Sequence, residues 1–85
     1  MSDQGRVTLR LTNQLSDWRT VVLEPWTGEY KLRSGETLDV VANGNRDLPL
    51  QIELSEDRII VYCFDSAGAQ MSIFRNGKEV RASEH

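Results

Sequence analysis

The 85-residue sequence contains one cysteine and one histidine. A single cysteine cannot form a disulfide within the chain, whereas small secreted domains usually depend on such crosslinks. Nucleophilic catalysis needs a base beside the nucleophile, and zinc or blue-copper sites need several histidine or cysteine ligands. His85 is the last residue and Cys63 lies in an apolar segment, which is typical of a buried small hydrophobic residue. We therefore predict a protein that is not an enzyme and holds no metal or cofactor.

Long apolar runs and charge clusters are also missing. No stretch approaches the roughly 18 apolar residues that cross a bilayer, and the N-terminal "MSDQGRV" lacks the apolar core of a signal peptide. The 10 basic and 13 acidic residues are interspersed, with a net charge of -3, which argues against a nucleic-acid partner. We expect a soluble cytoplasmic protein that binds neither nucleic acid nor membrane.

The segments between the two prolines and six glycines alternate apolar and polar residues. A period of two is typical of half-buried strands. In "RVTLRLT", Val7, Leu9 and Leu11 share one face, while "RIIVYCF" is apolar on both faces and predicts a central strand. The expected strands cover residues 6–12, 20–24, 29–33, 36–42, 48–54, 58–64, 71–74 and 78–82.

Turn residues separate these runs. They are "SGE" at 34–36, "NGN" at 43–45, "SED" at 55–57, "SAG" at 66–68 and "NG" at 76–77. Asn76-Gly77 between two strands is a strong two-residue hairpin signal. Seven or eight short strands in one domain, residues 1–85 with an ordered core of about 6–81, predict an all-β fold. We expect an antiparallel sandwich or a partly open barrel in which hairpin neighbours dominate.

The stretch "VLEPWTGEY" at 22–30 has two interpretations. Pro25 must end a strand or lie on a sheet edge, and Gly28 allows the chain to reverse. Trp26 would then fold over one end of the core as a plug, with Tyr30 beside it and its hydroxyl in water. Alternatively, Trp18, Trp26 and Tyr30 form a platform for a sugar ring or a peptide. Large aromatic residues in small domains are mostly core, which favours the plug.

Two segments, "LEPWTGEYKLRSGETLDVVANG" at 23–44 and "DRIIVYCFDSAGAQMSIFRNGKEV" at 57–80, carry a resemblance that covers most of the chain. Their layout is similar to that of small uncharacterised bacterial all-β proteins: a strand, Glu-Pro-Trp, a turn with glycine, a tyrosine, a Gly-Glu turn and a Val-rich strand. "YCFDSAG" at 62–68 departs from that pattern, in which a turn richer in Gly and Trp is expected. The resemblance implies one compact β domain and carries over no functional residues.

Several strands carry apolar residues on the face opposite their main apolar stripe: Val22, Val41, Ile60, Tyr62, Phe64 and Phe74. A contiguous exposed patch of this kind marks a protein interface, and a neighbouring sheet could equally cover it. The sequence therefore predicts a non-enzymatic interaction module that binds a protein partner, most simply a second copy through Val22, Val41, Ile60, Tyr62 and Phe74. The alternative is a small-ligand or carbohydrate-binding module that uses Trp18, Trp26 and Tyr30.

Overall fold

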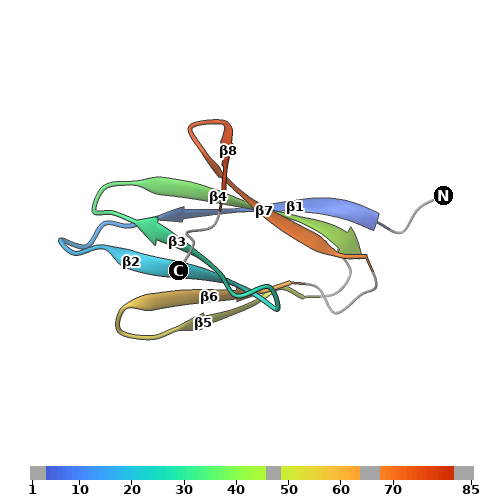
Figure 1. The fold of residues 1–85 in the computed structure, drawn as a ribbon, viewed down its shortest axis with the longest axis horizontal. Coiled ribbons are helices and arrows are strands. Elements are labelled where there is room, and N and C mark those ends of the chain that lie inside the picture. The colour runs from blue at the N-terminus through green and yellow to red at the C-terminus, as the bar shows by residue number, and fades with distance from the viewer. Residues whose placement is uncertain (1–3, 46–48, 64–67, 82–85) are drawn as a thin grey trace.

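The chain forms two open four-stranded sheets that pack face to face (Figure 1). The computed structural model describes residues 4–45, 49–63 and 68–81, and these contain no helix. The strands are β1 Gln4–Thr12, β2 Arg19–Glu24, β3 Gly28–Leu32, β4 Thr37–Asn45, β5 Gln51–Leu54, β6 Arg58–Tyr62, β7 Gln70–Arg75 and β8 Lys78–Val80. The predicted all-β fold is confirmed, and its form is a sandwich with open sheets.

Sheet A has the order β1-β4-β7-β8 and sheet B the order β3-β2-β6-β5. The hairpins β2–β3, β5–β6 and β7–β8 pair antiparallel, as the short connections predicted. The β2–β6 pair is parallel and is the point at which the described strands depart from the expected antiparallel pairing. Parallel neighbours need a long crossover. Here the chain between β2 and β6 runs through β3, crosses to the other sheet as β4 and returns as β5.

The core lies between the inner faces of the sheets, and period-two alternation selects it. In β4, Leu38, Val40 and Ala42 are fully buried, as their predicted common face requires. The cluster joins both sheets through Val21, Leu23, Leu32, Leu38, Val40, Val61 and Ile73. β6 lies between β2 and β5, so its predicted central position is confirmed. Each inner side chain loses its contact with water without breaking the hydrogen bonds of its strand, which is why the alternation decides the fold.

Two predicted turns differ from the structure. "NGN" at 43–45 lies within β4, because β1 extends to Gln4 and pairs with it. At the β2–β3 turn, the residue with positive φ is Thr27 (φ 57), while Gly28 begins β3. The Asn76-Gly77 hairpin is confirmed, with φ values of 54 and 80 that suit a tight two-residue turn.

Candidate functional site

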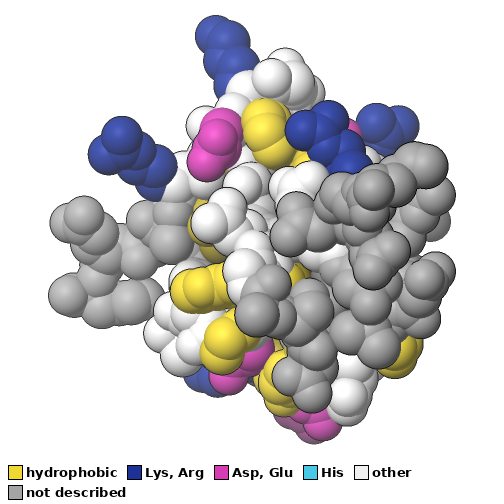
Figure 2. Space-filling view, turned by 90° about the vertical axis from the view of Figure 1, so that its right-hand side faces the viewer, with side chains coloured by type: hydrophobic (Ala, Val, Ile, Leu, Met, Phe, Trp, Pro, Cys, Tyr) yellow, Lys and Arg dark blue, Asp and Glu magenta, His cyan; other side chains and the backbone are white. Residues whose placement is uncertain are grey.

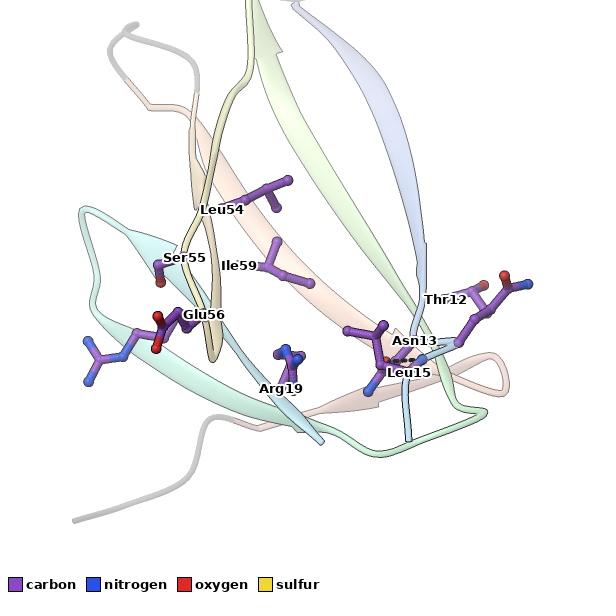
Figure 3. A pocket seen from close by; sticks show the side chains of 10 residues that line it. Thr12, Asn13, Leu15, Arg19, Leu54, Ser55, Glu56 and Ile59 are labelled. Atoms are coloured by element: carbon purple, nitrogen blue, oxygen red, sulfur yellow. Dashed lines mark hydrogen bonds between the residues drawn. The ribbon is translucent and has the colours of Figure 1, made fainter. Parts of the chain in front are cut away.

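One side of the sandwich is open between the ends of β1 and the β5–β6 hairpin. A cavity of about 270 Å³ lies there, and its lining includes Thr12, Asn13 and Leu15 on one wall and Leu54 and Ile59 on the other. Figure 3 shows Leu54 and Ile59 pointing from sheet B into the space that faces β1 and β4. We call this region, with Leu15, Ile52, Leu54 and Ile59, the open side.

Strand β5 exposes its apolar residues, whereas the sequence predicted a core strand over 48–54. Ile52 pairs with Val61 and Leu54 with Ile59, so both side chains face inward. They are nevertheless 41% and 78% exposed. β5 is one of the two edge strands of its sheet, and sheet A leaves its inner face largely uncovered. The sequence predicted the correct face for these side chains but the wrong burial. Ile52 and Leu54 form an aliphatic surface that is in contact with water.

Asn13 fixes the loop that leads from β1 to β2. It is the buried polar residue at 4% exposure, and its Nδ2 donates to the carbonyl oxygens of Leu32 at 3.0 Å and Asp17 at 2.8 Å. Its Oδ1 accepts a hydrogen bond of 2.9 Å from the backbone N–H of Leu15, which is the pattern of an Asx turn. These bonds hold Leu15 at the rim of the cavity, where it is 53% exposed. Our sequence analysis missed this role, although an asparagine directly after a strand is a signal for such a turn.

Charged side chains border the aliphatic residues of the open side, and Arg19 lies on the same inner face of β2 as the core residues Val21 and Leu23. Arg19, Glu56 and Arg58 line the cavity together with Ser55. The cavity is below the usual range of small-molecule pockets, roughly 300–1,000 Å³. Among the described residues, no group of three or more His, Cys, Asp or Glu side chains is placed to hold a metal ion. A surface on which aliphatic side chains lie beside charged ones suits contact with another protein surface.

Trp26 is 46% exposed, so the predicted core plug is wrong. The last pair of the β2–β3 hairpin is Leu23 with Gly28, and Leu23 is the last core residue of β2. Trp26 belongs to the turn beyond this pair, where the Thr27 N–H donates to Glu24 Oε1 at 3.1 Å. The turn is closed by its own polar groups, and the indole lies outside the core.

The three aromatic residues of the proposed platform do not come together. Trp18 precedes β2 and stacks on Lys31, whose Nζ is 4.6 Å from the ring centroid. Trp26 follows the opposite end of β2, and a six-residue strand is roughly 20 Å long, so the two tryptophans flank the strand at different ends. Tyr30 packs against the core as predicted. Its hydroxyl, which the sequence placed in water, is partly removed from water, and this burial raises the pKa of the phenol.

The five predicted interface residues are divided between two opposite surfaces. Val22 and Ile60 are paired neighbours on the outer face of sheet B, with Tyr62 two residues further along β6. Val41 and Phe74 lie on the outer face of sheet A. Phe64 is outside the described residues. One contiguous patch is therefore not formed, and Val22 is only 7% exposed in the middle of its sheet.

Polar contacts occupy part of both outer faces. The Tyr62 hydroxyl donates to a carboxylate oxygen of Glu53, and this hydrogen bond raises the pKa of the phenol. On sheet A, Arg10 donates to both carboxylate oxygens of Asp39 and lowers the pKa of that acid. Figure 2 shows one end of the molecule, where Lys and Arg side chains gather on the sheet A side and hydrophobic side chains lie in separate places. The polar contacts thus occupy the neighbourhood of Tyr62 on sheet B and of Asp39 on sheet A.

Cys63 is half-buried and lies one residue beyond the end of β6, whereas the sequence predicted that it lies inside the strand.

Within the described ranges, no helix has the length and apolar content to cross a membrane. Comparison with protein-family models, curated proteins and solved structures finds no match to this chain.

Proposed function

We propose that this chain is a non-enzymatic interaction module that binds another protein across its open side. The observation that carries the proposal is the exposure of three aliphatic side chains there: Leu15 at 53%, Ile52 at 41% and Leu54 at 78%. Exposed apolar surface of this kind, rimmed by polar groups, marks interaction sites on small soluble domains.

The fold gives this surface a fixed shape. β5 is held by its ladder to β6, and the loop with Leu15 is held by Asn13. A partner that covers these side chains therefore orders few additional groups on this chain, which lowers the entropic cost of binding. The charged residues that line the cavity, Arg19, Glu56 and Arg58, can add selectivity for the partner.

The alternative of a carbohydrate-binding module needs aromatic rings that face one ligand together. Trp18 and Trp26 lie at opposite ends of β2, and Tyr30 packs on the core. Each exposed indole could contact a sugar ring only without the help of the other aromatic residues. This separation supports the interaction module over the carbohydrate-binding module. We also propose a cytoplasmic location and kinship with small bacterial all-β proteins, on the single cysteine and the sequence pattern described above.

A photo-crosslinking amino acid at position 54 tests the proposed function in cells that make the protein. The control places the same amino acid at Lys78, which is exposed on β8 at the opposite edge of sheet A. We expect a discrete covalent protein adduct from position 54 and none from position 78. Absence of an adduct at position 54, or equal adducts at both positions, would contradict the proposal.

A further inference from the structure

We infer that the open side is occupied by a second copy of this chain, with β1 of one copy pairing antiparallel with β1 of the other across a two-fold axis. This inference rests on the proposed function and names its partner. The sequence predicted self-association through residues that lie on the outer sheet faces. The inferred dimer forms at a sheet edge instead.

β1 is the most extensive unpaired edge of the fold. It has nine residues, whereas the edge strands β3, β5 and β8 have five, four and three. Among the described strands, β1 pairs only with β4. Natural sheets protect long edges with lysine, proline, bulges or a covering segment, because free N–H and C=O groups invite another strand. β1 contains neither lysine nor proline, and its register with β4 runs without a bulge. Its charged residues are Arg6 and Arg10, and Arg10 is paired with Asp39 of the neighbouring strand β4.

The ladder between β1 and β4 shows which backbone groups face the open edge. The N–H of Asn13, directly after β1, donates to the carbonyl of Glu36 at 3.0 Å. Because strand residues alternate in the direction of their backbone groups, odd-numbered residues of β1 bond to β4 and even-numbered residues face outward. The close side-chain contact between Thr12 and Thr37, 2.9 Å between hydroxyls, fits the non-hydrogen-bonded position that this alternation assigns to Thr12.

One register satisfies both the free backbone groups and the side chains. With Leu9 opposite Leu9 of the second copy, Thr8 exchanges backbone hydrogen bonds with Arg10 of that copy, and Leu11 lies opposite its Val7. Registers centred on Thr8 or Arg10 place arginines opposite one another, which is destabilising. A register centred on Val7 places Leu11 opposite position 3, outside the described strand, and a register centred on Leu11 places Leu9 opposite the polar Asn13.

The same two-fold axis closes the open side. Val7, Leu9 and Leu11 are half-buried on the inner face of β1, and Leu9 and Leu11 pack against the edge of the core. Pairing of β1 turns the open sides of the two copies toward each other, so that Ile52 and Leu54 of each copy face apolar surface of the other. Backbone hydrogen bonds thereby set the register, while the aliphatic side chains lose contact with water.

Disulfide trapping tests both the partner and the register, in a chain that carries Cys63→Ala. In the inferred register, Leu9 faces its own copy in a non-hydrogen-bonded pair with Cα atoms about 4.5 Å apart, which a disulfide can bridge. Two Leu11 positions are instead separated by roughly 13 Å along the strand. We expect Leu9→Cys to yield at least about tenfold more disulfide-linked dimer than Leu11→Cys in a redox buffer. A mixture of Val7→Cys and Leu11→Cys chains is expected to form the mixed dimer.

Equal crosslinking of Leu9→Cys and Leu11→Cys overturns the register. Light scattering of the wild type gives an independent measurement that does not depend on a folded cysteine variant. The inference expects a dimer that Thr8→Pro weakens at least about tenfold, because proline removes the outward N–H, while Thr8→Ala leaves it unchanged. A wild type that stays monomeric at roughly 500 µM overturns the inference. If position 54 then crosslinks to a different protein, the proposed function stands and only the homodimer fails.

Discussion

The substitutions Leu54→Ala and Leu38→Ala compare an exposed and a buried leucine that both point toward the inside of the sandwich. Leu38 is fully buried, while Leu54 is 78% exposed. We expect Leu38→Ala to lower the free energy of unfolding strongly and Leu54→Ala to change it little in the monomer.

The magnitudes follow from the buried area. Full burial of a leucine side chain contributes about 1.5–3 kcal/mol. Leu54 keeps only about a fifth of its surface from water, so its truncation should cost less than about 0.6 kcal/mol on the same scale. Leu38→Ala also leaves a cavity in the core, which brings the expected loss to about 2–5 kcal/mol.

Urea unfolding followed by far-ultraviolet circular dichroism at about 1 µM protein measures both variants with the monomer as the folded state. At higher protein concentration, the cost of Leu54→Ala should grow, because the wild type gains stability from association and the variant gains less. A loss above about 2 kcal/mol for Leu54→Ala at low concentration would place this leucine in the monomer core and refute the reasoning.

Further substitutions test individual contacts. Trp26→Ala should cost less than about 1 kcal/mol in the same urea assay, and a loss of about 3–5 kcal/mol would restore the core plug. Asn13→Ala should cost about 1–3 kcal/mol, because it leaves backbone groups without their partner; an unchanged midpoint would contradict the role of the Asx turn. Glu53→Gln should lower the pKa of Tyr62, measured by ultraviolet titration, because the hydrogen bond to the Glu53 carboxylate raises that pKa. An unchanged pKa would show that the hydrogen bond does not form in solution. The pKa of Asp39 is lower in the folded chain, so its contribution to stability is present above the unfolded pKa, near 4, and lost as the pH falls through the folded value. Unfolding midpoints should therefore fall on acidification, and less so in Asp39→Asn; identical pH profiles would count against this contribution.

Local patterns in the sequence were enough for the fold class and most strands. Alternation in β4 identified Leu38 and Val40 as core, and both are buried. Asn76-Gly77 predicted its hairpin because few residues other than glycine and asparagine adopt positive φ at low cost. These features depend on neighbouring residues alone, so they can be read without knowledge of the other strands.

The open side depends on which strands lie at the edges, and alternation does not contain that information. Leu54 and Val61 both have inward positions, yet only the central strand β6 is covered by the opposite sheet. For the same reason, Val22 and Val41 looked like one surplus face although they belong to different sheets. Trp26 was misjudged because hydrophobicity favours burial, while the turn that holds it projects past the last strand pair.

Amide hydrogen exchange in β1, measured as a function of protein concentration, tests the use of the open side most directly. Leu9 donates its N–H toward β4 in the inferred ladder, so its exchange should be slow at every concentration. The amides of Thr8 and Arg10 face the open edge, so they should exchange rapidly at about 1 µM and slow down as the concentration rises into the dimer range. Exchange at Thr8 and Arg10 that does not change with concentration would contradict the account.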